Sequence, residues 1–521
     1  MISHFSQALS NFCNSNDDLF FVFLALLFAL WAAWFASVQL KKARGQKPLP
    51  PGPWGLPLVG NLPFLDPELH SYFATLAQTY GPILTLKLGG KISIVISSPA
   101  IAREVLKEQD VTFANRDIPV VVTAMDYGGH DIVFTPYGAE WRMLRKVCVK
   151  DMLGHATLDA FYSYRRREIQ NMIKFLSEKK GCPIDVGEQM FVTVLNVITS
   201  MLWGGTIEGE EGARIGAEFR ETVYEITKLL GSPNVSDFFP WLAWLDLQGM
   251  NKQMKLVATK LESIFDKIIG MRTKLEGNKE TTGSKDFLQV LLQLKNAADA
   301  KTPLTMDHVR ALLMDMVVGG TETTSNTVEF ALAEMMNRPE TIKKAQQELE
   351  EIVGKDNIVE EFHIQKLPYL QAVMKEVLRL HPALPLMVPH CPSESTVVGN
   401  YTIPRGARVF VNVWAIHRDP TIWENPVEFL PERFLNGNGD YSGNDFNYLP
   451  FGSGRRICAG MPMAERMAMF SLASLLHYFD WDLPMGMKLD LSEKFGIVLK
   501  KKMPLIAILK PRSLENPTSI N

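Results

Sequence analysis

A single cysteine, Cys458, lies in the glycine-rich segment Phe451-Gly-Ser-Gly-Arg-Arg-Ile-Cys-Ala-Gly460. Glycines let a backbone approach a bulky planar group and turn its N–H donors toward one point. Those donors, the adjacent arginines and the start of a helix predicted at 461–478 all favour a thiolate over a thiol. With no other Cys or His close by, the segment fits a single-thiolate ligand to haem iron. The alternative is an ordinary glycine-rich turn with a bystander cysteine.

An acid and a base, Glu376 and Arg379, are three residues apart on a helix predicted at 365–380. Residues i and i+3 lie on one helix face, so the two side chains can share a partner. The alternative for such a pair on its own is a solvated ion pair at the surface.

A third candidate is the segment Gly319 to Thr324, inside a helix predicted at 305–337. Two adjacent glycines in a helix cost about 1 kcal/mol each relative to alanine, so some benefit should offset them. The missing side chains would let this helix lie against a flat cofactor. Glu322 and Thr323, an acid and a hydroxyl beside it, could then relay protons at this face of the helix. The alternative is a glycine kink in a core helix.

The elements that position these groups are mostly helical. Alternating apolar residues predict a β-hairpin at 83–97 around Gly89-Gly90 and another from Thr396 to Val413, turning at Pro404-Arg405-Gly406. Helical periodicity covers 99–109, 139–152, 158–179, 213–231, 251–276, 305–337, 340–353, 365–380 and 461–478. No repeat of 20–50 residues is present. The pattern predicts one large domain, mainly α with small β-sheets.

The composition supports a globular protein. The 521 residues are 46% hydrophobic and 21% charged, which suits a sizeable core and excludes disorder over most of the length. The net charge of −3 gives no indication of nucleic-acid binding. Five cysteines without a CxxC pair argue against a zinc ribbon, a cysteine-ligated iron–sulfur cluster or a disulfide framework.

The N-terminus predicts a membrane anchor. Residues 19–38 carry no charge, and at about 1.5 Å per residue they span the roughly 30 Å hydrocarbon core. Basic residues follow this stretch and two aspartates precede it, so the positive-inside rule puts the rest of the chain in the cytosol. We expect a lumenal segment at 1–18, the anchor at 19–38, a basic, proline-rich hinge at 39–53, one domain at 54–512 and a flexible tail at 513–521. A buried helix of a soluble protein is the alternative.

Together these segments resemble the cytochrome P-450 superfamily of haem-thiolate monooxygenases, from the anchor to about residue 510. The family's haem loop, F-x-x-G-x-R-x-C-x-G, is matched in full by Phe451, Gly454, Arg456, Cys458 and Gly460. The resemblance implies haem b with its iron bound by the Cys458 thiolate, which makes this residue the metal ligand. It also implies electrons from an NADPH–cytochrome P-450 reductase, with NADPH used only indirectly, and dioxygen as co-substrate. The enzyme would then be a single-pass protein of the endoplasmic reticulum membrane.

The resemblance also assigns roles to other residues. Trp141 and Arg145 match the family's W-x-x-x-R, which implies that they meet a haem propionate, with Arg456 as another propionate partner. Pro431-Glu-Arg-Phe434 resembles the element that adds Arg433 to Glu376 and Arg379 in a buried structural triad. Glu322 and Thr323 match the family's catalytic relay segment, which implies that they face bound dioxygen and relay protons to it. The basic residues around Trp141, Arg145 and Arg456 either dock an acidic electron donor or form a solvated helix face: Arg142, Lys146, Lys150 and Arg455.

The layout of the family places the substrate pocket in four segments. The residues chosen from them are Phe113, Val121, Met125, Val317, Gly319, Leu384, Phe495 and Ile497. These segments are mostly apolar, which implies an apolar substrate, with charge confined to Asp126 and Asp131. The aromatic stretch 237–244 either dips into the membrane near a lipid-side entrance or packs in the core.

Several stretches of the sequence resemble those of plant microsomal hydroxylases of specialised metabolism, in particular enzymes of the (+)-δ-cadinene 8-hydroxylase type. The stretches that carry this likeness are 131–134, 201–205, 233–237 and 246–249. It implies hydroxylation of a terpenoid first, such as a sesquiterpene, and of a flavonoid second. Two other functions are a dioxygen-independent haem isomerase or dehydratase, and a non-catalytic haem carrier or sensor. The intact relay segment argues against both.

Overall fold

The computed structural model describes residues 25, 28–29, 47–125, 129–204, 209–277, 286–296, 303–437 and 439–512. Within these residues no helix combines the length and the apolar character that crossing a membrane requires. The predicted anchor at 19–38 lies almost entirely outside the described residues, as do the first part of the hinge and the tail at 513–521. The described part is mainly helical with small sheets, as predicted.

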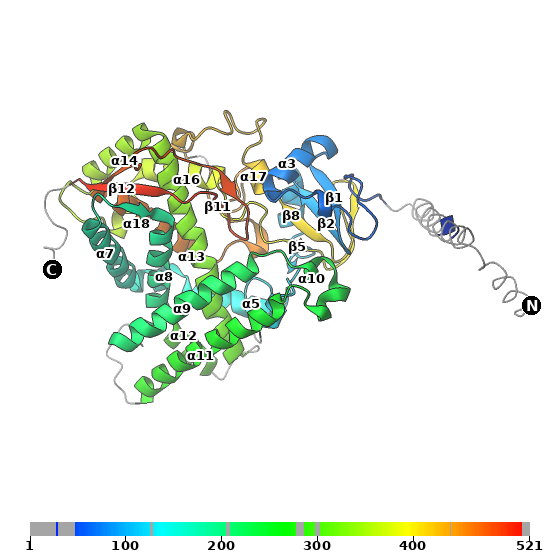
Figure 1. Cartoon of the computed structure of the whole chain (residues 1–521), viewed down its shortest axis with the longest axis horizontal. Coiled ribbons are helices and arrows are strands. Elements are labelled where there is room, and N and C mark those ends of the chain that lie inside the picture. Colours follow the sequence, from blue (N-terminus) through cyan, green and yellow to red (C-terminus); the bar gives the residue numbers. More distant parts are fainter. Residues whose placement is uncertain are drawn as a thin grey trace, which may run out of the picture.

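The largest sheet has five strands in the order β1-β2-β8-β5-β3. β1 (Ile83–Leu88) and β2 (Lys91–Ile96) form the predicted hairpin, with Leu88 opposite Lys91 across the Gly89-Gly90 turn. β8 (Arg408–Val411) runs parallel to β2, and β5 (His390–Cys391) and β3 (Asn115–Arg116) extend the sheet antiparallel. Helix α3 (Leu69–Tyr80) packs on this sheet, and together they form the lobe at the right of Figure 1.

The second predicted hairpin has its turn in another place. β6 (Thr396–Val398) and β7 (Tyr401–Ile403) pair around Gly399-Asn400, which have positive φ angles of 52° and 71°. A glycine–asparagine pair suits a two-residue hairpin turn that needs left-handed backbone. Residues 404–406 instead connect β7 to β8 of the large sheet. The prediction was wrong because Pro-Arg-Gly has turn chemistry too, and only the tertiary pairing decides between the two sites.

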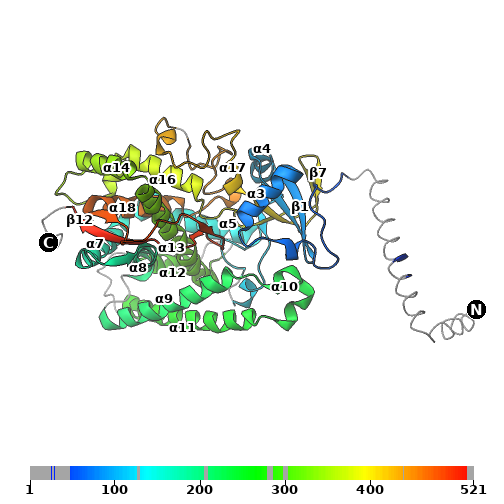
Figure 2. The same ribbon diagram turned by 45° about the horizontal axis from the view of Figure 1, so that its top comes forward.

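The remaining helices form the other lobe, except that the short helices α4 (Pro99–Arg103), α10 (Val235–Phe238) and α17 (Val413–Ile416) lie beside the sheet (Figures 1 and 2). The bounds of the others are α5 (Ala139–Lys146), α6 (His155–Ala160), α7 (Tyr162–Glu178), α8 (Val186–Trp203), α9 (Gly209–Leu230), α11 (Met250–Gly277), α12 (Phe287–Asn296), α13 (Met306–Asn337), α14 (Pro339–Ile352), α15 (Glu361–Ile364), α16 (Pro368–Leu380) and α18 (Met461–Tyr478). α4 and α5 continue as single π-helical turns, η2 (Glu104–Glu108) and η4 (Val147–Met152). A 3-10 turn, η5 (Pro240–Leu245), follows α10.

Three longer helices, α3, α8 and α12, were not predicted, and neither were the short helices α10, α15 and α17. α8 shows why, because ten of its 18 residues are buried and apolar residues occur all round it. A helix that is apolar on every side has no amphipathic period for sequence analysis to detect. It packs between α7, α12 and α13, in the interior of the helical lobe.

Helix α13 is the central element. It runs for 32 residues, most of them buried, and it contacts α8 on one side and α14, α16 and α18 on others. Figure 2 shows it running obliquely through the middle of the helical lobe, among the other helices. Two small sheets complete the fold: β4 (Pro183–Asp185) with β12 (Ile506–Pro511) and β9 (Phe479–Asp482), and the hairpin of β10 (Glu493–Lys494) with β11 (Lys500–Lys501).

Candidate active site

The glycine-rich loop around Cys458 is a tight structure that ends where α18 begins. The Cys458 N–H donates to the Phe451 carbonyl at 3.0 Å, and the Ile457 N–H donates to the Gly454 carbonyl at 3.2 Å. Gly454 has a φ of 66°, and a Cβ on it would lie 2.0 Å from the carbonyl oxygen of Leu106. The loop therefore packs backbone against backbone on η2, an approach that only glycine allows.

The Cys458 side chain is accessible to solvent, yet it is surrounded by protein at longer range. This burial raises the pKa of the thiol, and the N–H donors of Gly460 and Met461, together with the charge of Arg145, offset the increase only in part. The N–H donors at the start of α18 thus favour the thiolate, as predicted, whereas burial, which the sequence does not show, opposes it. Coordination to a metal has to displace the proton, as is general for thiolate sites.

Glu376, Arg379 and Arg433 meet behind this loop. Arg379 holds both carboxylate oxygens of Glu376, at 2.7 and 2.8 Å, and Arg433 donates from Nε to Glu376 Oε1 at 3.0 Å. The Glu376 and Arg379 side chains are both completely buried. Arg379 also donates to the carbonyls of His417, Pro426 and Glu428, so the group ties α16 to the segment that precedes the haem loop.

His417 connects this triad to the cysteine loop. Its Nδ1 lies 3.2 Å from the Arg379 carbonyl, and its Nε2 accepts the Leu449 N–H at 2.9 Å. The imidazole is therefore neutral, with its proton on Nδ1. Burial and the nearby Arg379 and Arg418 charges lower the pKa of His417 to about 3, which keeps it neutral.

Trp141, Arg145 and Arg456 gather on the α5 side of the loop. Arg145 donates to the Ile457 carbonyl at 2.5 Å, and the Arg456 guanidinium lies 4.6 Å from the Trp141 ring centroid. Trp141 Nε1 and Arg456 both donate to the carbonyl of Ile132 at 3.1 Å. Arg456 further donates to the carbonyls of Ala114, Val133 and Thr135. The hydrogen bonds of Arg145 and Arg456 in the described residues thus go to neutral carbonyls and leave the charge uncompensated by a direct ion pair.

Arg116 and His390 join this cluster, and sequence analysis gave neither of them a role. Arg116 donates to the Val388 carbonyl at 2.5 Å, while its buried Nε has no partner within the described part of the chain. Burial, together with the charge of Arg456, lowers the pKa of Arg116 to about 9. His390 Nδ1 bonds to the Phe113 carbonyl at 2.8 Å. No motif marks Arg116 in the sequence, because it reaches the site through a two-residue strand.

These observations fit a planar cofactor with acidic side groups. One thiol is presented by a close-packed loop, and three arginines beside it lack carboxylate hydrogen-bond partners among the described residues. An orphaned guanidinium N–H in a buried position is costly unless a ligand accepts from it. Carboxylates are suitable acceptors, because arginine binds them with charge-assisted hydrogen bonds. The residues present therefore fit haem, whose propionates supply such carboxylates.

The two glycines of α13 serve different purposes. A Cβ on Gly319 would meet nothing within 4 Å, whereas a Cβ on Gly320 would lie 2.8 Å from Cδ1 of Ile198 in α8. Gly319 thus leaves open space beside the helix, as expected for a helix next to a flat cofactor. Gly320 allows close packing between two helices, so the expectation that both glycines face the cofactor is not met.

Thr323 and Glu322 point in different directions. The Thr323 hydroxyl donates to the Gly319 carbonyl at 2.7 Å and lies at the open side of α13. The Glu322 carboxylate is 2.7 Å from Lys500 Nζ on β11, and its side chain is only 8% exposed. Successive residues of a helix are about 100° apart around its axis, which accounts for the separation. Lys500 carries no motif, so sequence analysis could not assign it this contact.

The predicted pocket residues differ in accessibility. Phe113, Val121 and Val317 are fully enclosed in the core, and Met125 is nearly so. Gly319, Leu384, Phe495 and Ile497 keep accessible surface. Phe495 stacks on His70 with 5.8 Å between the ring centroids. Of the two predicted charges, Asp126 lies outside the described residues, and Asp131 is buried and accepts the N–H groups of Val133 and Phe134.

The fold and the site define a haem-thiolate type of enzyme, and comparison with known proteins agrees. Residues 50–508 match the family model described as Cytochrome P450, so the chain belongs to the cytochrome P450 family. With hydroxylases among its relatives, it is a monooxygenase with a haem iron cofactor. Enzymes of this kind use a redox partner, dioxygen and an organic substrate.

Two similar proteins illustrate the range of relatives. The chain is 38% identical over 507 residues to a flavonoid 3′-monooxygenase of Crocosmia x crocosmiiflora, covering 95% of this chain and 99% of that protein. It is 40% identical over 474 residues to a geraniol 8-hydroxylase of Swertia mussotii, covering 90% and 95%. Among solved structures, a zebra fish cytochrome P450 with progesterone is similar at a TM-score of 0.73 and 27% identity, covering 85% of this chain and 99% of that one.

Proposed function

We propose that residues 54–512 form a haem-thiolate domain in which Cys458 is the iron ligand. Arg116, Arg145 and Arg456, with Trp141, would hold the haem carboxylates, because these donors converge beside the loop and lack acidic hydrogen-bond partners among the described residues. Haem iron, when bound, supplies the activation of dioxygen for hydroxylation of a C–H bond. The protein's own tasks are to orient the substrate, to exclude water and to deliver protons.

Thr323 is the residue proposed to deliver protons at the open face of α13. Its hydroxyl donates to the Gly319 carbonyl, so to deliver a proton it has to leave that carbonyl and donate its own proton outward while its oxygen accepts a proton from solvent or from an acid. Glu322 is the acid proposed to supply that proton. It has to leave Lys500, or exchange a proton through water, to reach the hydroxyl beside it.

The proposed substrate is an apolar plant metabolite, first of all a terpenoid. The observation that carries this concerns the residues predicted to line the pocket. Those of them with accessible side chains are aliphatic or aromatic, namely Leu384, Phe495 and Ile497, and the buried Asp131 already accepts the N–H groups of Val133 and Phe134. A polyhydroxylated guest would bury hydroxyl groups without partners, which is costly. The 40% identity to a geraniol 8-hydroxylase is consistent with this class.

A flavonoid is the second candidate. The observation in its favour is the likeness, at 38% identity over nearly the whole length, to a flavonoid 3′-monooxygenase. Identities of 38% and 40% are too similar to decide between these classes, so pocket chemistry carries the ranking.

We also propose that the enzyme is anchored in the endoplasmic reticulum membrane by residues 19–38, with its domain in the cytosol and an NADPH–cytochrome P-450 reductase as donor. A membrane-facing patch, defined here as Trp54, Leu58, Trp241 and Trp244, supports this orientation. These side chains are between 56% and 90% exposed, which is unusual for large apolar groups. Hydrogen bonds from Gly89 to Val59 and from Gly90 to Phe238 bring the two halves of the patch together at the β1–β2 turn.

The substrate proposal is tested by producing the full chain with its reductase in yeast and supplying sesquiterpenes, monoterpenes, flavones and flavanones. We expect a hydroxylated terpenoid and a low-to-high-spin shift of the haem spectrum on terpenoid binding. Efficient turnover of a flavonoid, with no terpenoid product and no spin shift, would reverse the ranking.

The membrane-facing patch is tested separately. A chain lacking residues 1–40 should remain partly bound to vesicles, and changing Trp241 and Trp244 to Ser in that chain should release it.

A further inference from the structure

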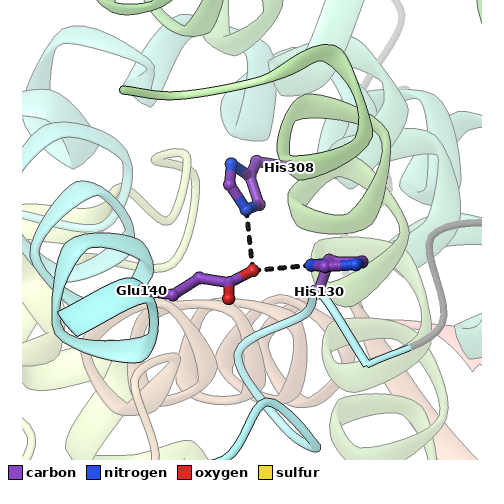
Figure 3. A group of neighbouring side chains, drawn as sticks. All are labelled: His130, Glu140 and His308. Atoms are coloured by element: carbon purple, nitrogen blue, oxygen red, sulfur yellow. Dashed lines mark hydrogen bonds and ion pairs between the residues drawn. The ribbon is translucent and has the colours of Figure 1, made fainter. Parts of the chain in front are cut away.

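A second group of possible metal ligands lies apart from the cysteine loop. His130, Glu140 and His308 point toward one another in Figure 3. His130 comes from the segment before α5, Glu140 from the first turn of α5 and His308 from the first turn of α13. Their ligand atoms all lie within 4.8 Å of one another. We propose that these three side chains bind one divalent transition-metal ion of the zinc type.

The distances suit such an ion after a small adjustment. Glu140 Oε1 lies 2.6 Å from His130 Nδ1 and 2.9 Å from His308 Nε2. Ligands about 2.0–2.2 Å from a tetrahedral zinc ion are roughly 3.3–3.6 Å from each other. The two contacts therefore open by about 1 Å or less when an ion replaces the shared protons. The side chains of His130 and Glu140 are 50% and 37% exposed, so they can move around the buried His308.

The chemistry of the three groups also suits zinc. Burial would raise the pKa of Glu140, but hydrogen bonds from both histidines outweigh it and lower that pKa, so the carboxylate is ionised near neutral pH. Within the described residues its ion-pair partners are these two histidines and no lysine or arginine. Two imidazoles and one carboxylate form a donor set that zinc accepts in open sites, with water in the fourth position.

His308 has a second contact that limits the affinity. The Thr305 N–H donates to His308 Nδ1 at 3.0 Å as part of the cap of α13, so the imidazole proton resides on Nε2 and is donated to Glu140. Binding a metal at Nε2 moves this proton to Nδ1 and breaks the contact with Thr305. The Thr305 hydroxyl still accepts a hydrogen bond from the backbone N–H of His308, so the helix keeps part of its cap. We therefore expect weaker binding than in a closed four-ligand site.

The ion would connect segments next to the haem-binding contacts. Ile132, two residues after His130, offers the carbonyl that accepts from Trp141 and Arg456, and Glu140 directly precedes Trp141. A bound ion would thus connect α5, the start of α13 and the segment that precedes α5. We expect zinc to raise the thermal midpoint of the holoenzyme.

The test uses the full-length holoenzyme and zinc chloride, with bound zinc measured by equilibrium dialysis and the thermal midpoint followed by haem absorbance. His130→Ala and Glu140→Gln should each either lose one bound zinc ion relative to the wild type or bind it about tenfold or more weakly. His363→Gln is the matched control. His363 has the same helix position and the same Nδ1 contact with its cap, but it belongs to no metal-ligating group in the described residues.

Zinc affinity and a zinc-dependent thermal shift that are lost in both variants, and kept in His363→Gln, would support the site. All preparations should show the same reduced carbon monoxide spectrum, which confirms that the fold and the haem are intact. Equal zinc binding by wild type and His130→Ala, or no zinc binding by the wild type, would overturn the proposal.

Discussion

The two sides of the candidate active site are built differently. Behind the Cys458 loop, Glu376, Arg379 and His417 are completely buried, and each makes several hydrogen bonds. On the other side, Thr323 lies at the open face of α13, and Glu322 is held by a half-exposed lysine of the β10–β11 hairpin. Buried polar networks fix geometry at a high cost of disruption, whereas exposed pairs are worth little and rearrange readily. In the proposed function, the side that would hold the cofactor is thus rigid, and the side that would receive substrate is adaptable.

The largest expected effect comes from Glu376→Gln. The change leaves Arg379 and Arg433 without their shared anion in a buried site, at a cost of about 3–5 kcal/mol. We expect low yield and little bound haem, measured as haem per protein. Glu432→Gln is the control, because it removes an exposed pair with Lys344, and such pairs contribute about 0–1 kcal/mol. Normal haem content in Glu376→Gln would contradict the difference between the two sides.

Gly454→Ala should have the next largest effect. Its φ of 66° disfavours alanine, and the new Cβ would clash with the Leu106 carbonyl. Gly437→Ala is a matched control, with a φ of 78° but nothing within 4 Å of an added Cβ. The control should lose about 1–2 kcal/mol from backbone strain alone. Gly454→Ala should lose clearly more stability in urea, and equal losses would show that the loop does not depend on its contact with η2.

Two buried histidines should respond to pH in opposite directions. His417, on the loop side, is neutral with a pKa lowered to about 3, so its contribution is present above pH 6.5 and is lost as pH falls toward 3. His381 lies between Glu334 and the hairpin residue Glu493. Burial opposes its protonation, but both carboxylates raise its pKa, so its contribution is full below pH 6.5 and declines as pH rises through the folded pKa.

The destabilisation caused by His417→Gln should therefore shrink as pH falls from 7 to 5, by up to about 1.4 kcal/mol per pH unit. That caused by His381→Gln should instead shrink as pH rises above 6.5. Urea midpoints of the holoenzyme between pH 5 and 8.5 measure both effects. If the destabilisation changed with pH in the same direction in both variants, the two histidines would have the same charge state in the folded protein, and the prediction would be contradicted.

The smallest expected effect is that of Lys500→Gln. Without this lysine the Glu322 carboxylate loses the partner that fixes its position, 2.7 Å away. We expect product per NADPH to fall about two- to fivefold with a matching rise in peroxide, while haem content and substrate-binding spectra stay unchanged. Lys502→Gln, an exposed neighbour on the same segment, is the control. An unchanged product yield in Lys500→Gln would show that Lys500 does not position the relay acid.

The features that the sequence could predict lie mostly on the buried side, around the Cys458 loop. The cysteine loop and the Glu376–Arg379 spacing are local patterns, so their elements could be placed from spacing alone. Arg116 and Lys500 reach the site through two-residue strands whose pairing depends on distant partners, and no local pattern marks them. The burial that raises the pKa of the Cys458 thiol was also missed, because burial is a property of the whole fold. Gly320 was assigned to the cofactor because sequence does not reveal that α8 passes beside it.

The most direct test of the account is the reduced carbon monoxide difference spectrum of Cys458→Ser beside the wild type. The central claim is that the rigid loop presents one thiolate to the haem iron. The wild type should show the strongly red-shifted Soret band of a thiolate-ligated haem. In Cys458→Ser that band should be absent and turnover should vanish. A wild-type spectrum in Cys458→Ser would contradict the assignment of the ligand, and with it the division of the site described above.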